Sequence, residues 1–161
     1  MNTASAVRDR GAPELSAVAA MVTAAALVWL VLLAASPIAA SRGRLGWMAA
    51  VVYQAGSLIC HQRPERSFHL DGVQLPVCAR CFGLYASGAL GVILAWVGRR
   101  RSSARTTRIA LGLAAMPIAA SVGLEWAGAI ATTNVFRMLT AVPLGLVGGL
   151  VIVGALRADR V

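Results

Sequence analysis

Four long apolar stretches alternate with short polar segments along this chain. They run approximately over residues 15–35, 77–97, 109–130 and 138–156. A helix of about 20 residues crosses a hydrocarbon core of roughly 30 Å, so each stretch is long enough to span a membrane. The pattern predicts an all-α fold, in which residues 1–161 form one integral membrane domain with four transmembrane helices in a polytopic bundle.

A fifth apolar stretch, Leu45 to Ile59, is shorter and is interrupted by polar and small residues. As a helix it would rise only about 22 Å, which is less than the thickness of the hydrocarbon core. We therefore expect a short interfacial or re-entrant helix that carries Trp47 and Tyr53 at headgroup depth.

The positions of the arginines predict the orientation in the membrane. Residues 99–108, RRRSSARTTR, place five arginines in a short loop between two predicted spans. Because cytoplasmic loops are rich in cationic residues, we assign this loop and both termini to the cytoplasm. The polar residues 60–81, here called the Cys/His segment, then lie on the extracytoplasmic side. Four-span and five-span topologies both put nine arginines inside and six outside, so charge does not distinguish them.

The composition supports a membrane protein and indicates which classes of binding partner to expect. Hydrophobic residues make up 58% of the chain and charged residues only 13%, unlike a soluble globular domain. The net charge of +9 would suit a nucleic-acid-binding protein. However, the arginines lie between apolar spans and form no stripe with interleaved aromatic residues. We expect membrane lipids as partners and no nucleic acid, and a homo-oligomer is compatible with the sequence.

Glycines in two of the predicted spans indicate close helix packing. The last span contains a G-x-x-x-G motif, and the second carries three glycines with alanines between them. Small residues let transmembrane backbones approach one another closely. The glycines concerned are Gly83, Gly88, Gly91, Gly145 and Gly149.

The Cys/His segment contains all three cysteines and both histidines of the chain, in the sequence CHQRPERSFHLDGVQLPVCARC. Cys78 and Cys81 form a C-x-x-C pair at the start of a predicted helix, and Cys60 and His61 precede the connecting loop. Three sulfurs and one nitrogen suit a tetrahedral zinc ion. We expect the cysteines as thiolate ligands with His61 as the fourth. His69 is the alternative, because adjacent residues rarely face one ion without a bend.

Other functions of the cysteines remain open at this point. The Cys78/Cys81 pair would suit a membrane thiol–disulfide oxidoreductase, and Arg80 between them would lower thiol pKa values. A structural disulfide, or reduced cysteines packed among apolar residues, would need no further chemistry. A small transporter is a further alternative, although Glu125 alone supplies a carboxylate within the spans. We favour a metal-binding protein that is not an enzyme; if it is one, thiol–disulfide exchange is the expected reaction.

Charged residues outside the cysteine cluster provide further candidate sites. Glu125 lies within the third span toward its outer end, where an ionised carboxylate requires a partner. We expect an ion pair with Arg137 or Arg80, close to Asn134 in the following outer turn. Two more arginines flank Pro64 and Glu65 in the Cys/His segment, where they form either a solvated loop or a clamp for a lipid headgroup or anionic substrate. They are Arg63 and Arg66.

Two short motifs in the Cys/His segment and the following helix together resemble the signature of the DUF2085 family. They are CHQRPERSF at 60–68 and PVCARCFGLY at 76–85. A third, TTNVFRMLTAVPLG, is similar to the family's C-terminal region but has Ala141 where glycine is expected. The resemblance covers approximately residues 45–150 and implies a small prokaryotic integral membrane protein of unknown function. It also implies that one set of residues acts as a unit: Cys60, His61, Gln62, Arg63, Pro64, Arg66, Ser67, Cys78, Arg80, Cys81, Gly83 and Tyr85.

Overall fold

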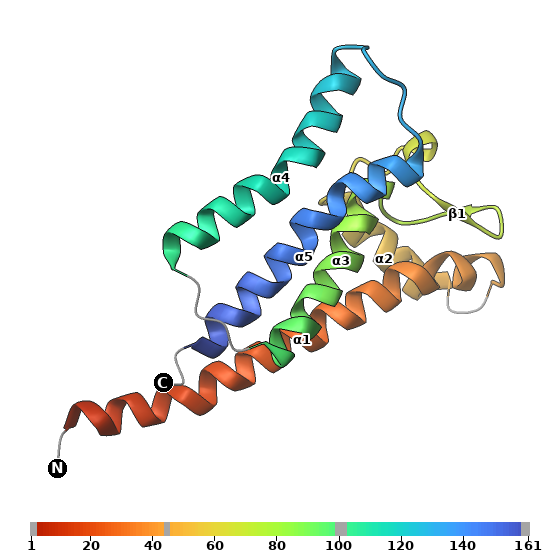
Figure 1. Ribbon diagram of the computed structural model, residues 1–161. Coiled ribbons are helices and arrows are strands. Elements are labelled where there is room, and N and C mark those ends of the chain that lie inside the picture. Colours follow the sequence, from red (N-terminus) through yellow and green to blue (C-terminus); the bar gives the residue numbers. More distant parts are fainter. Residues whose placement is uncertain (1–2, 44–45, 99–102, 159–161) are drawn as a thin grey trace.

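The computed structural model describes residues 3–43, 46–98 and 103–158, with side chains from residue 15 to residue 157 (Figure 1). Three arginines of the predicted cytoplasmic loop, at 99–101, lie outside the described residues, as does Leu45 at the start of the fifth apolar stretch. The elements in chain order are α1 (Thr3–Ser41), α2 (Gly46–Ser57), the 3-10 turn η1 (Pro64–Arg66), β1 (His69–Leu70), β2 (Val73–Gln74), α3 (Ala79–Val97), α4 (Ala104–Trp126) and α5 (Asn134–Ala158).

Four of these helices are long and apolar enough to cross a membrane, which confirms the predicted all-α membrane architecture. They are residues Leu15–Ser41 of α1, the whole of α3 and α4, and Asn134–Arg157 of α5. Helix α2 has 12 residues and rises only about 18 Å, so it does not reach across the hydrocarbon core. It packs against α1. Trp47 on α2 is exposed, whereas Tyr53 turns inward and its hydroxyl donates to the carbonyl oxygen of Gln74.

Two helices, α4 and α5, begin four or five residues earlier than the predicted spans, because hydroxyl side chains cap their N-termini. Helix α4 begins at Ala104 because the Ser103 hydroxyl accepts the backbone N–H of Thr106 at 3.1 Å. It ends at Trp126, before the expected Ile130, because Gly128 adopts a left-handed φ of 70° that turns the backbone away. Helix α5 begins at Asn134, ahead of the expected start near residue 138, because the Thr133 hydroxyl accepts the backbone N–H of Phe136 at 3.2 Å.

Helices α3 and α5 form the most extensive helix contact in the bundle. A Cβ atom on Gly91 would overlap the backbone of Leu146, and one on Gly149 would overlap Gly88. Gly83 and Gly145 are equally tight against the facing helix. The predicted packing role of these glycines is therefore confirmed. Ala141, in place of the expected glycine, is fully buried.

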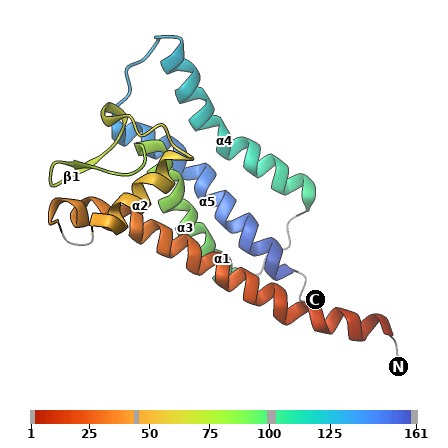
Figure 2. The same cartoon turned by 180° about the vertical axis from the view of Figure 1, so that it is seen from behind.

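The Cys/His segment lies at one end of the bundle. Figures 1 and 2 show the first turns of α1 and the last turns of α5 toward one end, and the short β1–β2 hairpin at the other. Around the former end, Trp96 donates to the Thr23 hydroxyl at 2.9 Å, and the guanidinium of Arg157 lies 4.5 Å above the Trp96 ring. These contacts tie α1, α3 and α5 together at the end away from the Cys/His segment.

Candidate functional site

The three cysteine side chains meet where α2, the polar loop and α3 converge. Cys60 follows α2, Cys78 is the residue immediately before α3, and Cys81 lies in the first turn of α3. Their sulfur atoms all lie within 4.8 Å of one another, and all three cysteines are free thiols. Two sulfurs bound to one tetrahedral zinc at about 2.3 Å would be about 3.8 Å apart, close to this arrangement.

Apolar side chains surround the sulfur cluster. Leu33 of α1, Val52 of α2 and Val77 are buried against Cys60 and Cys78, and the rings of Trp29 and Tyr85 pack beside them. These two rings meet edge to face, with centroids 6.1 Å apart. The wall excludes most water from the cluster, although Cys81 remains partly exposed.

Hydrogen bonds to sulfur favour a thiolate at the start of α3. The backbone N–H of Cys78 donates to Sγ of Cys60 at 3.1 Å. The hydrogen bond from the Cys81 thiol lowers the pKa of Cys78 to about 5, and smaller contributions come from Cys60 and from the positive field of His61. A thiolate is the form of cysteine that binds metals and attacks disulfides. The site can therefore support either of these chemistries.

A polar scaffold holds Cys60 opposite α3. Gln62 has a left-handed φ of 47°, and its Nε2 donates to the carbonyl oxygens of Tyr53 and Pro76, each at 2.7 Å. Gln74 Nε2 in turn donates to the Gln62 carbonyl oxygen at 2.6 Å. Because these bonds join α2 to the residue before Val77, they fix the loop on which Cys60 sits. Sequence reasoning from the residues alone missed this scaffold.

The β1–β2 hairpin that carries Gln74 was also missed. Its strands pair through Leu70 and Val73, and the turn between them is Asp71-Gly72 with φ values of 51° and 77°. An Asp-Gly dipeptide between apolar residues is the usual signal for such a turn, and it was available in the sequence.

The two histidines are placed less centrally than the cysteines. Within the described part of the chain, the compact ligand group contains the three sulfurs and neither histidine. His61 is exposed, and its Nδ1 accepts the backbone N–H of Arg63 at 3.1 Å. His69 is exposed on β1. The assignment of His61 or His69 as the fourth ligand stays a prediction.

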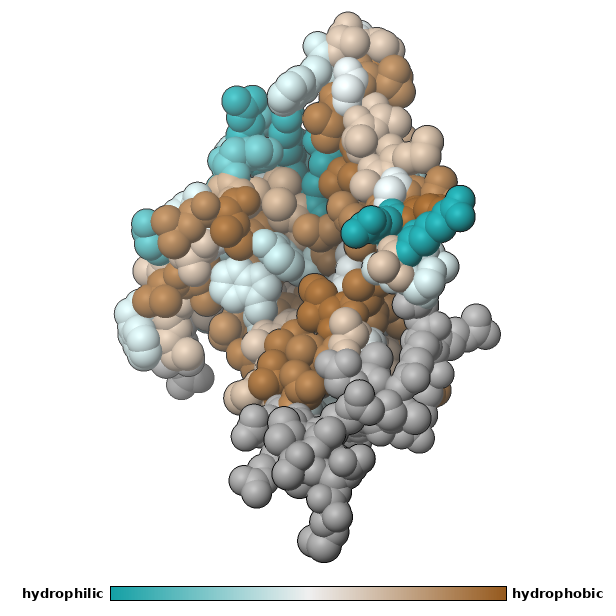
Figure 3. Space-filling model, turned by 90° about the vertical axis from the view of Figure 1, so that its left-hand side faces the viewer, coloured by the Kyte–Doolittle hydropathy of each residue, from teal (hydrophilic) through white to brown (hydrophobic). Residues whose placement is uncertain are grey.

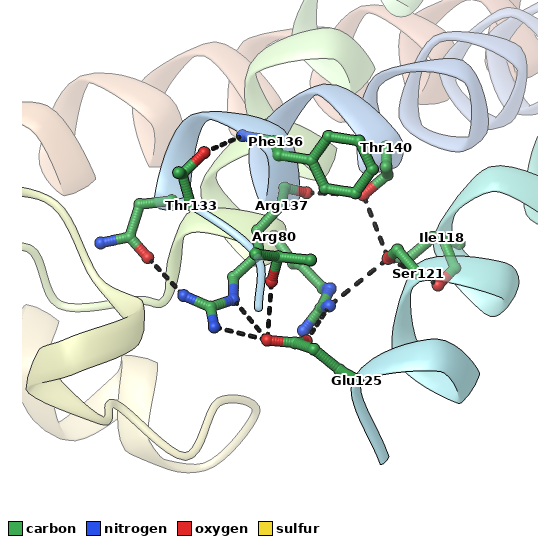
Figure 4. Close-up of polar contacts among 10 residues, drawn as sticks. Arg80, Ile118, Ser121, Glu125, Thr133, Phe136, Arg137 and Thr140 are labelled. Atoms are coloured by element: carbon green, nitrogen blue, oxygen red, sulfur yellow. Dashed lines mark hydrogen bonds and ion pairs between the residues drawn. The ribbon is translucent and has the colours of Figure 1, made fainter. Parts of the chain in front are cut away.

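Glu125 forms ion pairs with both of its expected partners. One carboxylate oxygen accepts from Nη2 of Arg80, and the other accepts from Nη2 and, at 3.0 Å, from Nε of Arg137 (Figure 4). The side chains are 8% exposed for Glu125 and 12% for each arginine. Residues of α3, α4 and α5 thus meet in one charged cluster, here called the Arg–Glu–Arg cluster, which comprises Arg80, Glu125 and Arg137.

Polar neighbours extend this cluster. Thr132 donates to Glu125 at 2.7 Å, and the amide of Asn134 accepts from Arg137 at 2.9 Å and donates to the Ser67 carbonyl oxygen at 3.0 Å. Asn134 lies beside the charged residues, as predicted, and its side chain links the cluster to the Cys/His segment. Thr132 and Ser67 were not assigned this role from the sequence.

A comparison with protein families matches residues 60–151 to a model described as "Predicted membrane protein (DUF2085)". The chain belongs to the DUF2085 family. The match covers both the sulfur cluster and the Arg–Glu–Arg cluster, and it confirms the resemblance seen in the sequence.

Two curated relatives of this DUF2085 protein are archaeal. An uncharacterized protein of Methanocaldococcus jannaschii is 46% identical over 48 residues, which are 30% of this chain and 31% of that protein. An uncharacterized protein of Methanothermobacter thermautotrophicus is 33% identical over 88 residues, which are 55% of this chain and 78% of that protein. The chain thus spans about a third of the first relative's length. No solved structure matches this DUF2085 chain.

The remaining two predicted site residues belong to the loop of the DUF2085 protein. Arg63 is exposed before η1, and Arg66 is half-buried at its end. Within the described residues both ion pairs use Glu125, so neither loop arginine is paired with a carboxylate. Whether they contact a lipid headgroup or an anionic substrate stays a prediction.

Proposed function

We propose that this DUF2085 protein binds one zinc ion through the thiolates of Cys60, Cys78 and Cys81. The observation that carries the proposal is the convergence of three sulfurs within 4.8 Å from two distant parts of the chain. Soft thiolate ligands in a tetrahedral arrangement select zinc among the common divalent metals. The N–H donated to Sγ of Cys60 supports the same reading, because outer-shell hydrogen bonds orient and stabilise metal-bound thiolates.

His61 is the proposed fourth ligand. Its Nδ1 already accepts a backbone N–H, which leaves Nε2 as the nitrogen for the metal. The ring follows Cys60 directly in the sequence, so a side-chain rotation would be needed to bring Nε2 to the sulfurs. A Cys3His shell closed in this way would be structural, and it would tie the Cys/His segment to the helices.

The proposed site lies on the extracytoplasmic side of the membrane. The positive-inside rule supports this orientation, since Arg105, Arg108 and Arg157 belong to the end of the bundle opposite the cysteines. In the sequence, the three consecutive arginines at 99–101 belong to the loop before Arg105 and so add positive charge to the same side. Both termini are then cytoplasmic.

Metal content and thiol reactivity test the proposal. Detergent-purified protein is analysed by elemental mass spectrometry, with a free-thiol count before and after chelation. We expect about one zinc per chain and thiols that react only after chelation, because metal-bound thiolates are protected. Cys60→Ser and His61→Ala should each lose zinc, while His69→Ala serves as the matched histidine control and should keep it. Protein without metal, with two of three thiols unreactive until a reductant is added, would refute the zinc site.

A second function is supported by the C-x-x-C pair at the start of α3, whose sulfurs lie within 4.8 Å of each other, together with the lowered pKa of Cys78. A Cys78 thiolate could attack a substrate disulfide, and Cys81 could resolve the mixed disulfide. The substrate would leave as a dithiol, and Cys78 and Cys81 would form a disulfide. The two proposals differ at Cys60. Cys60→Ser removes a zinc ligand but leaves a two-cysteine exchange site intact, so exchange activity that survives this substitution would favour the oxidoreductase.

A further inference from the structure

The Arg–Glu–Arg cluster carries one more positive than negative charge. Two guanidinium groups and one carboxylate give a formal +2 − 1 = +1. The two ion pairs of the described residues share this single carboxylate, so no second acid balances the cluster there. A net charge that is about nine-tenths removed from water is costly unless a counter-ion accompanies it.

Part of the Arg80 guanidinium has no acceptor. Its Nη2 donates to Glu125 and, at 3.4 Å, to the Ser121 hydroxyl. Its Nε is buried and has no hydrogen-bond partner among the described residues. A buried donor on a charged group normally finds an acceptor, so a further ligand at this position would satisfy both the charge and the hydrogen bond.

An exposed tryptophan beside the cluster indicates a position near the lipid headgroups. Trp126 is the residue after Glu125 at the end of α4, and it is 84% exposed. Exposed tryptophans of membrane proteins concentrate at the headgroup level. Figure 1 shows α4 beside α5 at the edge of the bundle, and in the upper half of Figure 3 hydrophilic residues lie next to apolar ones.

We propose that Arg80 and Arg137 bind the phosphate of a phosphodiester, the group that a phospholipid headgroup carries, between the outer ends of α4 and α5. A phosphodiester has one negative charge and would bring the cluster to neutrality. Guanidinium groups are suited to phosphate oxygens because their donors form a planar fork. Inorganic phosphate shares this chemistry, and its second charge would leave an excess of −1. The phosphate proposal does not rest on the proposed zinc site, because the arginines and Glu125 are not among the proposed zinc ligands.

Native mass spectrometry of the detergent-solubilised full chain tests the proposal. Phosphatidylglycerol is titrated in one series and inorganic phosphate in another, and a third series adds phosphate in competition with the lipid. Arg80→Gln and Arg137→Gln should each weaken lipid binding at least about tenfold, as expected for loss of hydrogen bonds to a charged group. The matched control is Arg42→Gln, an exposed arginine after α1, which should bind like the unaltered protein. Competition by free phosphate with the same dependence on the arginines would identify phosphate as the source.

Two further variants separate phosphate binding from a purely structural ion-pair network. Arg137→Lys keeps the charge but loses the fork, so it should weaken binding while the protein stays monodisperse and helical. Glu125→Gln raises the cluster charge to +2 and should bind the lipid at least as tightly as the unaltered chain. Equal lipid binding by the arginine variants and the Arg42→Gln control would overturn the proposal. So would loss of binding in folded Glu125→Gln, since the excess charge would then not be what attracts the ligand.

Discussion

A single added methyl group at Gly56 should disturb the sulfur cluster without touching a sulfur. Gly56 is the penultimate residue of α2, and its carbonyl oxygen accepts the N–H of Cys60 at 2.9 Å. A Cβ atom built there would overlap the carbonyl oxygen of Pro76 and lie 2.9 Å from Nε2 of Gln62. The backbone that leads to Cys78 and the scaffold that holds Cys60 would both have to move. Gly56→Ala therefore separates the two parts of the chain that bring the cysteines together.

The magnitude follows from the size of the overlap. Relief requires a displacement of about 1 Å, and forcing an extra methyl group into a packed site costs typically about 1–3 kcal/mol. Alanine's better helix propensity returns about 0.5–1 kcal/mol, which leaves a modest net loss of stability. Displaced support around a metal typically lowers affinity about 10–100-fold, and we expect zinc affinity to fall within that range.

Competition with a chromophoric chelator measures the zinc affinity, and thermal unfolding in detergent measures the stability. The matched control is Gly46→Ala in the same helix, where nothing lies within 4 Å of the added Cβ. It should keep its zinc affinity. Zinc affinity and unfolding midpoint that are both unchanged in Gly56→Ala would show that the close contact with Pro76 does not position the cysteines. If the unaltered protein binds no zinc but Gly56→Ala still lowers the unfolding midpoint, the packing argument holds and only the zinc site is refuted.

Two other pairs of glycine substitutions test the bundle itself. Gly149→Ala should lower the unfolding midpoint by an amount that reflects about 1–3 kcal/mol, because the new Cβ would overlap the backbone of α3; Gly148→Ala meets nothing within 4 Å and should not. Similar midpoints for these two variants would contradict the tight α3–α5 contact. Gly128→Ala should cost about 1–2 kcal/mol, because alanine is strained at a φ of 70°, whereas Gly123→Ala in an open position of α4 should be neutral or stabilising. A neutral Gly128→Ala would mean that the end of α4 is not fixed by this turn.

The sequence predicts the helices well because hydropathy is summed over about 20 residues, so that single substitutions hardly matter. Helix ends depend on single residues instead. The Ile130 boundary expected for α4 fails because apolarity continues past Trp126, while the conformation of Gly128 ends the helix. Glycine after a helix is a sequence signal for its end, but here the apolar residues on both sides of Gly128 outweigh it in a hydropathy sum.

The candidate sites divide in the same way. The Cys78 and Cys81 pair could be anticipated because C-x-x-C spacing is local, and Cys60 because a second thiol in the same polar segment suggests a shared site. The partners of Glu125 could be anticipated because a buried carboxylate requires a cation. The Gln62 and Gln74 scaffold could not, because it joins polar side chains to backbone oxygens at distant positions of the chain. Nothing in the residue types indicates which carbonyl a glutamine will reach.

The first turn of α3 places the two candidate sites on different sides of one helix. Successive helical residues are rotated by about 100°, so Cys78 and Cys81 share a side that Arg80 cannot share. The cysteines face α1, α2 and the loop, whereas Arg80 reaches α4 and lies with Arg137 of α5. Helix α3 therefore joins two groups of elements through chemically different contacts. The DUF2085 match, residues 60–151, begins at Cys60 and includes both clusters on this helix.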